Sequence, residues 1–202
     1  MSPLRDIKTG FRGSGNVGVG SPVFKAHCVT EGPFANLEIP YLEDIYEPLC
    51  LLRGFEENHE ELRQELKPER VMELLLSPDY SSINLCLKHE PHVAIPRSIN
   101  GDLSLHTAPF GKQSSDSRQM RYGLISFPDL VFFLHHTQLD RMWWRWQLID
   151  LAKRAKKSIG QAATDSSDKA FLEDKIPMRV LASDIKVLEL TSTESDLLCY
   201  RY

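Results

Sequence analysis

The chain has 202 residues, of which 42% are hydrophobic, and its formal net charge is −4. A chain of this length can bury a substantial core as one domain. It has neither the basic excess that attracts nucleic acid or anionic membranes nor the run of about 18 apolar residues that a bilayer span needs, so neither partner is expected. The start of the sequence lacks the apolar stretch of a secretory signal, which predicts an intracellular, cytoplasmic protein.

Residues 1–30 are rich in glycine. The glycines do not form a phosphate-binding fingerprint between a strand and a helix, so we predict an irregular lead-in. His27 within this segment is expected in an extended stretch. The four cysteines are scattered without a Cys-x-x-Cys pair, which predicts reduced, buried thiols. They are Cys28, Cys50, Cys86 and Cys199.

The middle of the chain predicts short helices. Residues 56–77 have a helical pattern with a charged face, and Pro68 opens a second short helix from Glu69 to Leu76. Another short element starts at Ser81. Near the end of the chain, residues 186–190 and 197–202 are expected to be short strands or extended segments.

The most informative stretch is residues 126–146, SFPDLVFFLHHTQLDRMWWRW. Ser126 followed by Asp129 fits a capping box, so the helix is predicted to begin there and to run to about Lys153. His135 and His136 lie roughly 100° apart around this helix and cannot both point at one target.

The two histidines therefore belong to different faces of the predicted helix. His136 shares its face with Asp140, which lies one turn on and within reach of the second ring nitrogen of a ligand imidazole. His135 shares its face with Leu139, Met142 and Trp146. The alternative is that one histidine is a hydrogen-bonded core residue and the other lies near the surface.

Residues 129–147, DLVFFLHHTQLDRMWWRWQ, closely resemble the second copper-binding signature of tyrosinases and catechol oxidases, the type-3 copper family. In that signature the second histidine of the pair binds copper, which assigns the ligand role to His136. The resemblance makes His135 a neighbouring residue, and Asp140 and Arg141 structural supports. Segments similar to fungal members of the family are VTEGPFANL at 29–37, CLLRGF at 50–55 and the ending LCYRY.

Residues 90–102 resemble the family segment Pro-His-Asn-x-Val-His, which is followed by Gly-Gly-Asp and carries two copper ligands on one helix face. His92 matches the first ligand, but Pro96 stands at the second and should also distort the turn, because its ring would collide with the carbonyl of His92. Val93 replaces an asparagine linked to phenol hydroxylation, which favours diphenol oxidation. Asn100 replaces the first glycine and tolerates a left-handed backbone.

Two further histidines are candidates for the missing ligand. His89 lies three residues before His92, but Pro91 makes a continuous helix through both of them doubtful. His106 lies in a loop that could fold back. We expect ordinary surface or loop positions for His89 and His106.

The resemblance implies a mainly α fold, a partial tyrosinase-type helical bundle with long irregular loops and a few short strands. It covers residues 1–202 as a single copper-binding-type domain that corresponds to the C-terminal half of the family's catalytic domain. Residues 103–125 are a polar stretch longer than the family's link, read as an inserted loop or as a gene-model error. The first copper-binding half of the family has no counterpart here.

The implied function is the copper-dependent oxidation of phenols and o-diphenols to quinones with O2. It is expected to be impaired, because the first copper site is missing and Pro96 replaces a ligand. One alternative is a mononuclear copper or zinc protein that uses His92 and His136 on a small aromatic metabolite. The other is a non-catalytic remnant.

The missing half would also remove helices against which Phe133 and the tryptophans pack. An exposed apolar helix face is therefore expected, covered by self-association or by a partner chain.

Overall fold

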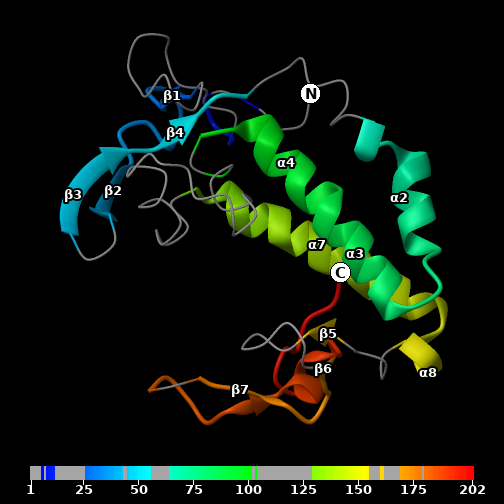
Figure 1. Ribbon diagram of the computed structural model, residues 1–202. Helices are drawn as coiled ribbons and strands as arrows, with labels where there is room; N and C mark the ends of the chain where they lie inside the picture. Colours follow the sequence, from blue (N-terminus) through cyan, green and yellow to red (C-terminus); the bar gives the residue numbers. More distant parts are fainter. Residues whose placement is uncertain are drawn as a thin grey trace. The chain divides into compact units, whose positions relative to one another are not determined.

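The computed structural model describes residues 6, 8–11, 26–42, 45–55, 64–101, 103, 129–154, 160–161, 169–178 and 180–202 (Figure 1). The chain forms two compact units, which we call the first unit, residues 1–66 and 90–136, and the second unit, residues 67–89 and 137–202. The predicted glycine-rich lead-in and the loop over 103–125 lie largely outside the described residues.

The predicted mainly α class is confirmed, because the longest elements are helices and the strands have two to six residues. The helices are α2 (Pro68–Leu75), α3 (Tyr80–His89), α4 (Pro91–Ile99), α7 (Val131–Ile149), α8 (Leu151–Arg154) and the 3-10 turn η4 (Val187–Leu190). The strands are β1 (His27–Cys28), β2 (Glu38–Leu42), β3 (Ile45–Cys50), β4 (Leu52–Arg53), β5 (Gly160–Gln161), β6 (Lys169–Ala170), β7 (Lys175–Ile176) and β8 (Ile185–Lys186). No helix of the described part is long and apolar enough to cross a membrane.

Short antiparallel strand pairs open the first unit. Strand β1 pairs with β4, and β2 pairs with β3 in a hairpin (Figure 1). The predicted extended stretch around His27 is therefore confirmed as a strand.

A disulfide joins Cys28 and Cys50, which corrects the prediction of reduced thiols for this pair. The two residues are 22 positions apart, so no local sequence motif predicts the bond. Strand pairing brings their Cα atoms to 5.4 Å, which is within the range of a disulfide. A loop of this size contributes about 3 kcal/mol in the chain-entropy account. Cys86 and Cys199 are free thiols.

The end of helix α4 is hydrogen-bonded to the segment that follows strand β4 in the same unit. The backbone N–H of Gly54 donates to the carbonyl of Ile99 at 2.9 Å. Gly101, just after the helix, has φ +62, and a Cβ there would lie 2.1 Å from the carbonyl oxygen of Leu52. Only glycine allows this approach. Asn100 has the expected positive φ, 59°, but its ψ of −166° lies outside the left-handed helical region.

A buried ion pair fixes the start of α7 within the first unit. Arg53 donates from Nε and Nη2 to the two oxygens of Asp129 at 2.8 and 2.6 Å, and these side chains are 0% and 1% exposed. Asp129 Oδ1 also accepts the N–H of Val131 at 2.9 Å, which caps the helix. The predicted start within residues 126–129 is thus corrected: α7 begins at Val131, and Asp129 lies before it as its cap. Ser126 lies outside the described residues.

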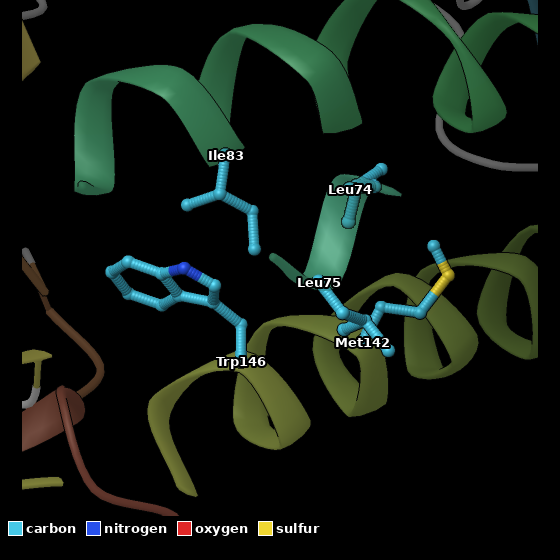
Figure 2. Close-up of a cluster of buried hydrophobic side chains, with 5 residues drawn as sticks. All are labelled: Leu74, Leu75, Ile83, Met142 and Trp146. Carbon is cyan, nitrogen blue, oxygen red and sulfur yellow. The ribbon is translucent and has the colours of Figure 1, made fainter. Parts of the chain in front are cut away.

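The core of the second unit is built on the later residues of α7. Trp146, fully buried, donates from Nε1 to the carbonyl of Ser77 at 2.8 Å. Figure 2 shows this tryptophan and Met142 on one helix, with α2 and α3 supplying the facing aliphatic side chains. Those side chains are Leu74, Leu75 and Ile83. The second predicted helix, opened by Pro68, is confirmed to within one residue.

The chain after α7 differs in part from the prediction. Helix α7 ends at Ile149, and a turn at Asp150 separates it from α8, so the single helix to about Lys153 is wrong. Of residues 186–190, predicted extended, only Lys186 is in a strand, and the rest form η4. Short i+3 hydrogen bonds, such as Thr191 N–H to Leu188 O, favour this tighter turn.

Candidate metal centre

Three histidines singled out from the sequence meet in the first unit. His92 comes from α4, and His135 and His136 come from the first part of α7. The ring centroids of His92 and His136 are 5.4 Å apart with the rings nearly perpendicular, and those of His92 and His135 are 5.8 Å apart. Residues 43 or 44 positions apart in the sequence therefore form one cluster.

The ring of His136 is oriented by the helix that carries it. Its Nδ1 lies 2.8 Å from the carbonyl oxygen of Phe132, one turn earlier. The ring centroids of Phe132 and His136 are 3.8 Å apart. Because a carbonyl can only accept, Nδ1 carries the proton and Nε2 keeps the lone pair that binds metals. The sequence suggested the carboxylate of Asp140 as the partner, and the structure places a backbone carbonyl there instead.

His135 has a different environment. It is only 6% exposed, and its Nε2 lies 3.3 Å from the carbonyl oxygen of His92. Burial, followed by the neighbouring His136 ring, lowers the pKa of His135 to about 4, so the imidazole is neutral at neutral pH. The alternative of a hydrogen-bonded core histidine thus describes His135.

The donor set of His92 and His136 fits a shared metal ion. Two imidazoles bound to one metal at about 2.1 Å have ring centroids roughly 5 Å apart, close to the spacing found here. Pro96, one turn after His92, is buried and supplies no ligand atom. Within the described ranges no group of three or more His, Cys, Asp or Glu side chains is placed to hold a metal.

Asp140 and Arg141 were predicted as structural supports, and those roles stay predictions. In the second unit, Asp140 Oδ2 accepts hydrogen bonds from the hydroxyls of Tyr200 and Tyr202 at 2.5 and 2.7 Å. Burial and then the Asp140 carboxylate raise the pKa of Tyr200 to about 12, and the same causes raise that of Tyr202. Arg141 is exposed.

Of the two histidines considered for the missing ligand, His89 is exposed at the end of α3, and His106 lies outside the described residues. Helix α3 stops at His89 and α4 starts at Pro91, so the doubt about a continuous helix is confirmed.

Sequence reasoning missed two features that shape the cluster. The first is Arg53, whose partner Asp129 lies 76 positions away. Only its place in the CLLRGF segment pointed to it. The second is the Phe132 carbonyl, which orients His136; a backbone group of this kind cannot be predicted from a side-chain pattern.

Paired histidines on α7 lie beside a histidine from the earlier helix α4, and this arrangement makes the cluster a candidate metal centre. The common central domain of tyrosinase matches residues 2–149, and the chain therefore belongs to the tyrosinase family. The resemblance found in the motifs is confirmed at the level of the family.

Relatives extend this finding over the whole chain. The tyrosinase-like protein phomQ1 of Diaporthe leptostromiformis is 34% identical over 221 residues, which cover 100% of this chain and 52% of that protein. Tyrosinase ustQ of Aspergillus flavus is 29% identical, with 96% of this chain and 50% of that protein covered. The chain thus spans about half the length of these relatives.

Among solved structures, the fold is similar to a polyphenol oxidase (mutant G292N) from Thermothelomyces thermophila. The TM-score is 0.63 at 23% identity, and the match covers 94% of this chain and 56% of that one. At this identity the likeness shows the fold alone.

Proposed function

We propose that this chain supplies the second copper-binding half of a tyrosinase-type oxidoreductase, with His92 and His136 as its copper ligands. The supporting observation is the meeting of these two rings, with centroids 5.4 Å apart. They are also the two histidines that match ligand positions of the family signature. The reaction class is oxidation of a small o-diphenol or phenol to a quinone with O2.

The contribution of this chain would be to position and orient the imidazoles that bind the metal. The Phe132 carbonyl holds Nδ1 of His136, and so presents Nε2 in a fixed direction. When bound, copper would supply the electron exchange between the phenol and O2. Val93 at the asparagine position favours diphenols, because the chain there offers no amide to hold a proton-accepting water.

Activity of the chain by itself is expected to be impaired. A metal site that works in catalysis has about three protein ligands. Only two of the proposed ligands, His92 and His136, are found among the described residues, and Pro96 stands at the position of a third. This small number of proposed ligands favours a second candidate function, that of a mononuclear copper protein. In that case the bound ion would act as a Lewis acid on a small aromatic metabolite.

Metal content and oxygen uptake on catechol test the proposal together. We expect the purified chain to bind copper, His136→Ala to lose it, and His89→Ala, which removes an exposed histidine, to keep it. Two coppers per active assembly with uptake lost in His136→Ala would support the oxidase. One copper without uptake would favour the mononuclear protein, and equal copper in His136→Ala and His89→Ala would contradict both candidates.

The start of α7 carries an exposed apolar face. Leu130, Phe133 and Leu134 follow i, i+3, i+4 spacing and are 45%, 54% and 43% exposed. Trp146 does not share this exposure, because it is fully buried. We propose that this face is covered by polypeptide equivalent to the other half of the longer relatives, supplied by a partner chain.

Solution size tests the partner proposal. Alone, the chain should associate through this face, and Phe133→Gln with Leu134→Gln should shift it toward monomer in light scattering. Leu148→Gln, a substitution at another half-exposed leucine of α7, should leave association unchanged. A stable, monodisperse monomer of the unaltered chain would contradict the proposal.

A further inference from the structure

Pro96 interrupts the hydrogen-bond pattern of α4 at a defined place. The helix runs through it from Pro91 to Ile99. In an α-helix the N–H of residue 96 would donate to the carbonyl of His92, but proline has no N–H. The residue that carries the candidate metal ligand therefore cannot receive its regular helical bond from Pro96.

A hydrogen bond from another helix reaches that carbonyl. His135 Nε2 lies 3.3 Å from the carbonyl oxygen of His92, and the two rings also contact each other. Because the carbonyl can only accept, His135 must be the Nε2–H tautomer. The donor is well shielded, since the His135 side chain is 6% exposed and lies on the buried side of α7.

We propose that His135 is a positioning residue: its Nε2–H replaces the backbone donor that Pro96 lacks and so fixes the turn of α4 that presents His92. The two neighbouring histidines of α7 then have opposite tautomers. His136 uses Nδ1–H on the Phe132 carbonyl and offers Nε2, whereas His135 uses Nε2–H on the His92 carbonyl. The role in metal binding rests on the proposed function, but the hydrogen-bond role does not.

This assignment also removes one nitrogen of the third nearby histidine from the candidate ligand atoms. The Nε2 atom of His135 is committed to a backbone oxygen, and a protonated nitrogen cannot bind a metal. The loss of a ligand at position 96 and the use of His135 as a donor are therefore two consequences of the same proline.

A double-mutant cycle tests the replacement of the missing donor. His135→Leu removes the donor, and Pro96→Ala restores the backbone N–H at position 96. We expect His135→Leu to weaken Cu(II) binding about tenfold with Pro96 present and less than about threefold in the Pro96→Ala background. His135→Gln, whose amide can donate, should stay within about threefold of the parent chain.

Nitrogen-15 NMR of histidine-labelled, metal-free protein supplies a readout that general structural damage would not give. We expect protonated Nε2 at His135 and protonated Nδ1 at His136 at neutral pH. A protonated Nδ1 at His135 would overturn the proposal, as would equal loss of Cu(II) affinity from His135→Leu in both backgrounds.

Failure of the proposed function can be told apart from failure of this inference. If the parent chain binds no Cu(II), the same cycle is read from urea unfolding midpoints. A larger drop in midpoint with Pro96 than with Ala at position 96 supports the positioning role. Equal drops overturn it.

Discussion

At the scale of single residues, backbone carbonyls decide what each histidine can do. The Phe132 carbonyl fixes the proton of His136 on Nδ1, and the His92 carbonyl fixes that of His135 on Nε2. The two neighbouring imidazoles therefore offer different nitrogens: His136 keeps a lone pair on Nε2, as the proposed ligand needs, and His135 donates from Nε2. A substitution that moves either carbonyl should alter the site without touching a ring.

Gly101 is a position where the backbone leaves no room for a side chain. Gly101→Ala should lower the free energy of unfolding by about 3 kcal/mol or more, because the new Cβ meets the Leu52 carbonyl and the left-handed φ adds strain. Urea unfolding measures the loss.

Gly32→Ala is the matched control. Gly32 also has a positive φ, 81°, so an alanine there meets the conformational strain of about 1 kcal/mol in a different setting from the Leu52 contact. Equal losses in the two variants would show that the close approach at Gly101 is not what costs stability.

The sequence predicted the histidine cluster better than its surroundings. His92 and His136 were singled out by the resemblance to the family's motifs, and the face formed by His135, Met142 and Trp146 follows from helical periodicity. The Cys28–Cys50 bond and the Arg53–Asp129 pair could not be predicted in this way. They depend on which strands and helix ends meet, and nothing local to these residues encodes that.

At the scale of elements, the buried Arg53–Asp129 pair joins β4 to the start of α7. Arg53→Met should cost about 3–5 kcal/mol, because it leaves the Asp129 carboxylate buried without its cation. Arg70→Met, in the exposed pair with Glu73, should cost less than about 1 kcal/mol. Similar midpoints of urea unfolding for the two variants would contradict the role given to the buried pair.

The contact of the C-terminal tyrosines with α7 predicts a pH dependence in the alkaline range. Burial and Asp140 raise the pKa of Tyr200 to about 12, so the folded chain keeps a proton that the unfolded chain loses near pH 10. The contribution of this tyrosine to stability is complete below about pH 10 and is lost as the pH rises through about 12.

Thermal unfolding followed from neutral pH upward, with phenolate absorbance recorded in parallel, measures this effect. Tyr200→Phe with Tyr202→Phe should flatten the alkaline fall in stability, and Tyr46→Phe, at an exposed tyrosine, should not. If the double variant shows the same steep loss of stability at alkaline pH, the loss must come from other titrating groups.

At the scale of the whole molecule, the chain is a tyrosinase family member about half as long as its relatives. Its described residues bring His92 of α4 and His136 of α7, the two proposed copper ligands, close together. The Cys28–Cys50 disulfide adds information about location, because such bonds persist in oxidising compartments. The cytoplasmic location expected from the sequence stays a prediction.

The most direct test of the central claim counts the imidazoles bound to Cu(II) in the loaded chain by pulsed electron paramagnetic resonance. We predict two imidazoles, one of which is lost in His92→Ala and one in His136→Ala, with no change in His89→Ala. Three imidazoles, or a count that falls in His135→Leu and not in His136→Ala, would contradict the account.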